Sequence, residues 1–89
     1  MKVIDKDPSA ELDYKMLWAD WLVTDTISVS SWVVNKDTIT IDGDLTGATD
    51  ATVFLSGGIA VTRYMVTNEI TTVAGLKDQR SIIINCTDR

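Results

Sequence analysis

The chain has 89 residues and a formal net charge of −5, which arises from 13 acidic and 8 basic residues with no histidine. This length is enough for one domain and too short for two, so we expect a single domain over residues 1–89. The acidic balance and the scattered basic residues exclude the phosphate-binding groove that a nucleic-acid partner requires, and the absence of histidine excludes a Cys–His nucleophile at Cys86.

The composition favours an all-β domain. Thr, Val and Ile contribute 12, 9 and 9 residues, and these β-branched side chains suit a pleated, half-buried surface. Clusters of turn-forming residues separate short β-rich runs, a spacing typical of a small sandwich or barrel. We expect residues 1–8 to be a flexible arm. No apolar run approaches the length of a membrane span, so no membrane partner is expected.

The first strand is expected over residues 12–18, because apolar and polar side chains alternate there and turn Tyr14 and Trp18 to one face. The competing interpretation is a helix over residues 9–22, because a Pro-Ser pair resembles a helix start and the aromatic residues have helical spacing. If the strand ends at Trp18, a turn follows, and Trp21 folds back to cover the open edge of the core.

The second strand is expected over residues 25–34. Ile27 and Val29 share one face of this strand, whereas Trp32 has the opposite parity. All of them can point inward only if a β-bulge near Ser30-Ser31 shifts the register by one residue.

Residues 42–46, Asp-Gly-Asp-Leu-Thr, lie between two short strands expected at residues 38–41 and 51–56. The pattern matches the signature of aspartate-nucleophile phosphatases, but that chemistry needs a magnesium site on a much longer chain. It also begins like a calcium loop, but Val53 stands where the bidentate acid should fall. We therefore expect a turn, with weak calcium binding as the alternative, and no catalytic residue, metal or cofactor.

Two long strands are expected over residues 59–72 and 80–87. Tyr64 stands near the start of the first, where a tyrosine can bury its ring and bond its hydroxyl to upstream backbone, and Val66 follows where antibody domains carry a cysteine. This ending favours an immunoglobulin-like antiparallel β-sandwich of about seven strands. The expected core consists of Tyr14, Trp18, Trp21, Ile27, Trp32, Tyr64, Val66, Ile82 and Ile84.

An ordered set of short segments runs along most of the chain. In order they are Asp7-Pro8, Leu12-Asp13-Tyr14, Asp20-Trp21-Leu22, Asp25-Thr26-Ile27, Ser31-Trp32, Leu55-Ser56-Gly57-Gly58, Tyr64-Met65-Val66-Thr67-Asn68 and Arg80-Ser81. With these segments the chain resembles the small tailed-phage virion proteins known as fibre-tail adaptors or head–tail-region proteins. It departs from them at Val23-Thr24, where a Gly-Asp-like turn is expected, and at Arg63, where a small polar residue is usual.

The resemblance implies a non-enzymatic structural role in the virion of a tailed phage or prophage, in the head–tail or tail-fibre region. It implies partners among portal, adaptor, tail or fibre subunits, assembly in multiple copies, and synthesis in the host bacterial cytoplasm. The alternative is an immunoglobulin-like module that binds a glycan or host receptor through a stacking platform of Trp18, Trp21 and Trp32.

Partner contacts are expected at two polar connections, because loops carry binding residues while the strands hold the core. These connections are residues 42–50 and 74–79. The candidate contact residues in them are Asp42, Asp44, Thr46, Asp50, Leu76, Lys77 and Asp78.

Overall fold

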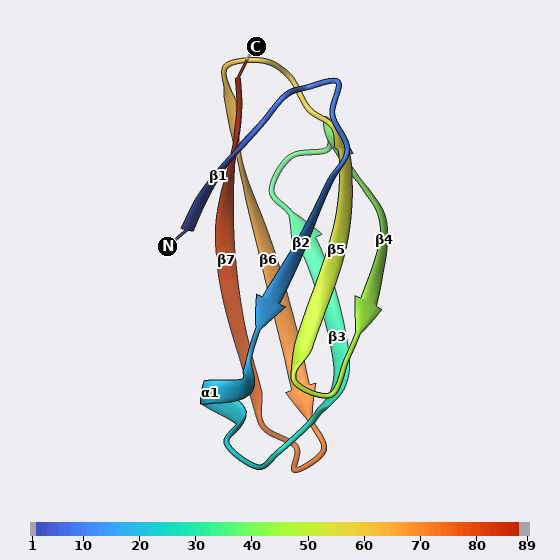
Figure 1. The fold of residues 1–89 in the computed structure, drawn as a ribbon, viewed down its shortest axis with the longest axis vertical. Coiled ribbons are helices and arrows are strands. Elements are labelled where there is room, and N and C mark those ends of the chain that lie inside the picture. Colours follow the sequence, from blue (N-terminus) through green and yellow to red (C-terminus); the bar gives the residue numbers. More distant parts are fainter. Residues whose placement is uncertain (1, 88–89) are drawn as a thin grey trace.

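The computed structural model describes residues 2–87, which form two packed β-sheets (Figure 1). The elements in chain order are β1 (Lys2–Lys6), β2 (Leu12–Leu17), α1 (Ala19–Leu22), β3 (Ile27–Val34), β4 (Ile39–Thr46), β5 (Asp50–Gly57), β6 (Thr62–Thr72) and β7 (Lys77–Cys86). One sheet has the order β1-β7-β6-β3 and the other the order β2-β5-β4. The expected all-β sandwich of about seven strands is confirmed.

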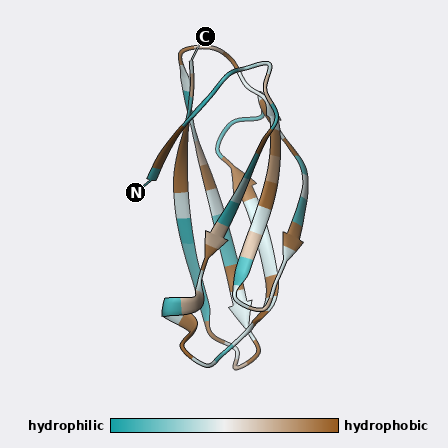
Figure 2. Ribbon diagram, viewed as in Figure 1, coloured by the Kyte–Doolittle hydropathy of each residue, from teal (hydrophilic) through white to brown (hydrophobic). Residues whose placement is uncertain are grey.

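The core fills the space between the two sheets because alternate side chains of each strand point inward. Strand β6 shows this clearly: Tyr64, Val66 and Ile70 are buried, whereas Met65 and Glu69 between them are exposed. Figure 2 shows the resulting bands of hydrophilic and hydrophobic residues along the strands. Among the described residues no helix has both the length and the apolar character needed to cross a bilayer.

Residues 12–17 form a strand, so the helix interpretation of residues 9–22 is wrong for most of that segment. Strand β2 pairs antiparallel with β5 from Leu12 to Leu17, and this ladder satisfies backbone groups that a helix would have left unpaired along β5. Within residues 9–22 the chain is helical only in the single turn α1, where the Leu22 N–H donates to the Trp18 carbonyl at 2.9 Å.

The first residues also differ from expectation, because residues 2–6 form β1 instead of a flexible arm. Strand β1 pairs in parallel with β7, with Lys2 opposite Ile82 and Lys6 opposite Cys86. The Lys6 side chain is buried, and its ammonium group donates to the Gly57 carbonyl at 2.6 Å. The edge of β7 provides the pairing partner, and a sequence pattern within residues 1–8 cannot reveal that edge.

A bulge exists in β3, but at a different position from the one expected. The register shifts between Ile27 and Val29, not at Ser30-Ser31. Ile27 and Trp32 are therefore both buried, while Val29 faces solvent. In a regular strand Ile27 and Trp32 would lie on opposite faces. The bulge adds one residue at the start of β3, where the chain enters the sheet from α1, and so brings both side chains to the inner face.

Candidate functional site

The tryptophans do not form a stacking platform, so that interpretation is wrong. Trp18 and Trp32 are buried, and the half-buried Trp21 packs edge-on against Trp18 with the ring centroids 5.7 Å apart. The Arg80 guanidinium lies 4.3 Å from the centre of the Trp18 ring, which is close enough for a cation–π contact. The Trp18 ring therefore makes its contacts within its own domain, with Trp21 and Arg80.

A buried polar network holds Trp18 in place. Its indole N–H donates to the Asn68 side-chain oxygen at 2.8 Å, and the Asn68 amide donates to Ser30 Oγ at 2.8 Å and to the Ser31 carbonyl at 3.0 Å. Asn68 is fully buried on β6 and links this strand to β3 and to Trp18, which lies between β2 and α1. Its only signal in the sequence is indirect: an amide side chain stands at an inward position of β6.

At the end of the sandwich opposite α1, the Tyr64 hydroxyl links two connections of the chain, the one between β3 and β4 and the one between β5 and β6. It accepts a hydrogen bond from the Ile59 N–H at 2.9 Å and shares one with Thr38 Oγ1 at 2.6 Å. The ring itself is fully buried.

Of the nine expected core residues, seven are buried, and the other two, Tyr14 and Trp21, are half-buried against the same core.

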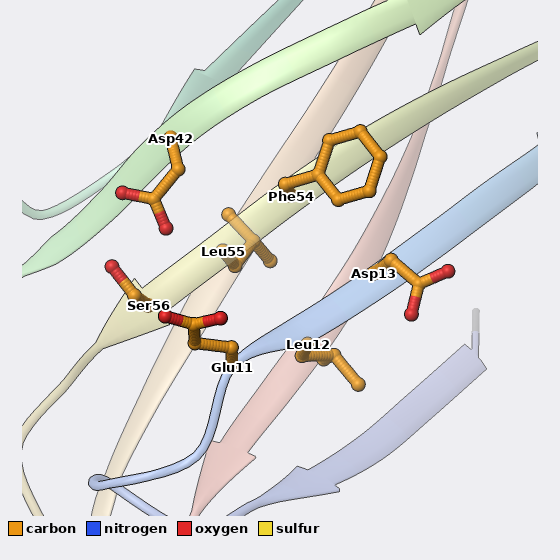
Figure 3. A pocket seen from close by; sticks show the side chains of 7 residues that line it. All are labelled: Glu11, Leu12, Asp13, Asp42, Phe54, Leu55 and Ser56. Carbon is orange, nitrogen blue, oxygen red and sulfur yellow. The ribbon is translucent and has the colours of Figure 1, made fainter.

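A shallow groove of about 450 Å³ lies on the outer face of the three-stranded sheet (Figure 3). It crosses all three strands, with β5 in the middle, β2 on one side and β4 on the other. Its lining residues are Glu11, Leu12, Asp13, Asp42, Phe54, Leu55 and Ser56.

The groove combines an exposed aromatic ring with acidic side chains. Phe54, the single Phe of the chain, is 37% exposed at the centre of the sheet. Figure 3 shows the carboxylates of Asp42 and Glu11 turned toward Ser56 from opposite sides of β5, while that of Asp13 turns away. This concentration of carboxylates suits recognition of a positively charged group.

The two expected partner connections prove to be mostly strand, which corrects their boundaries. Asp42, Asp44 and Thr46 belong to β4, and Asp50 begins β5, so only residues 47–49 connect these strands. The chain favours a long hairpin here because cross-strand pairs, such as Leu45 with Thr52, extend the ladder beyond residue 41.

In the second connection, Lys77 and Asp78 lie at the start of β7, so of the three candidate residues only Leu76 lies in the turn between β6 and β7, which is residues 73–76. The same end of the domain holds Asp25, whose pKa is lowered by a hydrogen bond with the Thr72 side chain and by the Thr26 N–H, which donates to its carboxylate at 2.8 Å.

Cys86 is a packing residue in this structure. It is buried on β7 next to Gly58, where an added Cβ would collide with the Cys86 sulfur. Burial raises the pKa of the thiol, so the reactive thiolate is disfavoured. Within residues 2–87 no set of three or more His, Cys, Asp or Glu side chains is placed to hold a metal ion.

Comparison with protein families gives a match that extends over almost the whole chain. The model of the family described as the podophage GP4 fiber-tail adaptor protein gp77 matches residues 6–85. The chain belongs to this family. No curated protein matches the chain significantly.

The fiber-tail adaptor match spans both sheets, from the last residue of β1 to the penultimate residue of β7. It includes every residue that lines the groove and every member of the Trp18 and Asn68 network. The sandwich is therefore the family's domain, and the groove is a surface of that domain.

Proposed function

We propose that the chain is a non-enzymatic structural protein of a tailed-phage or prophage virion, an adaptor module in the tail-fibre or head–tail region. The observation that carries the proposal is the match of the fiber-tail adaptor family to residues 6–85, because it covers β2 to β6 completely and all of β7 but its last residue. The neighbours of such an adaptor are other virion proteins, such as portal, adaptor, tail or fibre subunits, and virion parts assemble in symmetric copies.

The strand order supports an immunoglobulin-like module as part of the proposal. Lettering the strands A to G in chain order makes one sheet B-E-D and gives the other the order G-F-C with strand A added at its edge, close to the ABED and CFG sheets of immunoglobulin domains. The buried Trp32 on strand C and the Tyr64 hydroxyl bonded to the upstream Ile59 N–H fit the same fold.

Partner contacts are proposed at the end of the sandwich where the β4–β5 and β6–β7 hairpins turn, together with α1 (Figure 1). Asp42, Asp44, Thr46 and Asp50 belong to the first hairpin, and Leu76, Lys77 and Asp78 to the second. Hairpin turns tolerate side-chain exposure without loss of the core, so they provide room for specific contacts.

Deletion of the gene in its phage or prophage tests the proposal. We expect particles that package DNA but lack fibres and fail to adsorb, and a plasmid copy of the gene should restore both properties. Mass spectrometry of purified wild-type particles should detect the chain. Particles that retain fibres without it, or wild-type particles that do not contain it, would refute the adaptor role.

A further inference from the structure

We infer that two copies of the chain pair through the free edge of β3, antiparallel across a two-fold axis at Ser31, which joins their four-stranded sheets into one continuous sheet. This inference does not depend on the adaptor function proposed above. Three features of the edge support it: its lack of charge, the match of the strand to itself, and a buried N–H group without a partner.

Strand β3 is the edge strand without charged side chains. Within residues 2–87 the two sheets end in β1, β3, β2 and β4, and an edge strand presents unpaired backbone groups to solvent. Strands β1, β2 and β4 all carry charged side chains, which protect an edge from pairing. Strand β3 is eight residues long and has neither charge nor proline. In a chain with a net charge of −5, a second copy can therefore pair here without placing like charges along the strands.

The backbone of β3 sets the register of such a pair. The Asn35 N–H donates to the Met65 carbonyl, so these opposite residues form a hydrogen-bonded pair. Because bonded and non-bonded pairs alternate along an antiparallel ladder, the backbone groups of Ser31 face β6, whereas those of Ser30 and Trp32 face the free edge. With the two-fold axis at Ser31, Ser30 of each copy lies opposite Trp32 of the other and exchanges both backbone hydrogen bonds with it.

The outward side chains of β3 match themselves in this register. Val29 and Val33 are 58% and 62% exposed. The axis places Val29 opposite Val33 of the second copy, and Ser31 opposite Ser31 of the second copy, and β-branched side chains pair favourably across strands. This self-match is what an isologous interface requires, and because each copy has one β3, assembly through it stops at a dimer.

Trp32 supplies an independent observation. Its indole N–H is buried and has no hydrogen-bond partner within residues 2–87, and such a group costs stability. In the proposed register Ser30 of the second copy stands directly opposite Trp32 on the inner side. The Ser30 hydroxyl accepts one hydrogen bond from Asn68 and has a second lone pair that can accept the indole N–H. The occupant that the sequence of β3 fits is therefore a second copy of β3.

Sedimentation velocity of the full chain, from about 5 µM to about 1 mM, tests the inference. We expect a reversible monomer–dimer equilibrium with a Kd on the order of 10–100 µM, because one strand pair is smaller than a standard interface. Ser31→Asp and Ser31→Lys each place like charges directly opposite each other at the axis, so each variant alone should show a Kd raised at least about tenfold. An equimolar mixture of the two variants should dimerise at least as well as the unmodified chain.

Thr40→Asp is the matched control, because it adds the same charge at an exposed position of the edge strand β4 and should leave the Kd unchanged. Thermal unfolding checks the fold of each variant, since Glu69 lies opposite Ser31 within the domain. An unmodified chain that stays monomeric, an unchanged Kd for Ser31→Asp, or a mixture that dimerises no better than either variant alone would overturn the inference. The gene-deletion phenotype does not depend on these results, so the two proposals fail separately.

A different protein on this edge is a separate outcome of the test. In that case the chain stays monomeric in solution, and Ser31→Asp, but not Thr40→Asp, removes it from phage particles. This result would also overturn the inference, because it assigns the edge of β3 to a foreign strand.

Discussion

At the residue scale, two valines stand in a backbone conformation that side chains rarely adopt. Val23 and Val61 both have a φ of 60°, and they are 82% and 89% exposed. A β-branched residue in this region is strained by about 1–3 kcal/mol. Val23 is also the position where the resembling virion proteins lead us to expect a Gly-Asp-like turn, and the strained φ is a physical reason for glycine there.

Val23→Gly should therefore stabilise the domain. Relief of backbone strain outweighs the added flexibility of the unfolded chain, and we expect a gain of about 1 kcal/mol, or roughly 4–8 °C in Tm, measured by thermal unfolding. The matched control is Val33→Gly, the same change at an exposed residue inside β3, which should lower stability by about 1 kcal/mol. Equal destabilisation by both variants would contradict the assignment of strain to Val23.

The Asn68 amide is the residue on which the Trp18 end of the core depends. Asn68→Ala removes the acceptor of the Trp18 indole N–H and leaves that group buried without a partner. We expect a loss of about 3 kcal/mol in the free energy of unfolding, measured by urea denaturation. Asn85→Ala, which removes a single 3.2 Å bond between the Asn85 amide and Asp5 near the surface, should cost less than about 1 kcal/mol. A cost for Asn68→Ala as small as that of Asn85→Ala would show that the network is dispensable.

At the element scale, β1 adds a parallel strand to the edge of a sheet whose other strand pairs are antiparallel. Its parallel pairing covers the outer edge of β7 from Ile82 to Cys86. An uncovered edge of this kind is a template for pairing with other chains. Strand β1 thus stabilises the domain and also limits its self-association, which a flexible arm would not do.

Removal of residues 1–7 tests the role of β1. The truncated chain loses the β1–β7 ladder and the Lys6 contact to the Gly57 carbonyl, so we expect a loss of about 3 kcal/mol, or roughly 12–24 °C in Tm. Concentration-dependent association in analytical ultracentrifugation should accompany it. Val3→Thr, at an exposed position of β1, is the control and should leave Tm unchanged. An unchanged Tm after truncation would show that residues 1–7 do not stabilise the domain and behave as a flexible arm.

At the scale of the whole molecule, the sandwich is elongated, with principal extents of 42 × 22 × 17 Å. Two hairpin turns and α1 gather at one end, and the crossings near Tyr64 lie at the other (Figure 1). The groove lies on the side of the sandwich, on the outer face of a sheet. A module of this shape can contact one neighbour with its end and another with its face, which is the geometry that an adaptor requires.

The inward positions of β6 and β7 were predictable, because each follows a strict period of two and one misplaced residue would expose the whole face. The groove was not predictable, because Asp42 and Glu11 are separated by β5 in space and by 31 positions in the sequence. The expected partner connections included Asp42 but were described as loops. Phe54 carries no signal of its own, because an outward aromatic in a strand looks the same in sequence as an ordinary surface residue.

The sequence by itself determined that this protein is an all-β sandwich with its core on alternate residues, because burial of apolar side chains on a pleated strand imposes that period on any such chain. Only the tertiary structure decided which edge β1 joins, where β3 bulges, and that Asn68 receives the indole N–H of Trp18, which lies 50 residues away along the chain. These features depend on pairing between distant segments, and such pairing is set by the free energy of the whole packed domain, not by any local pattern.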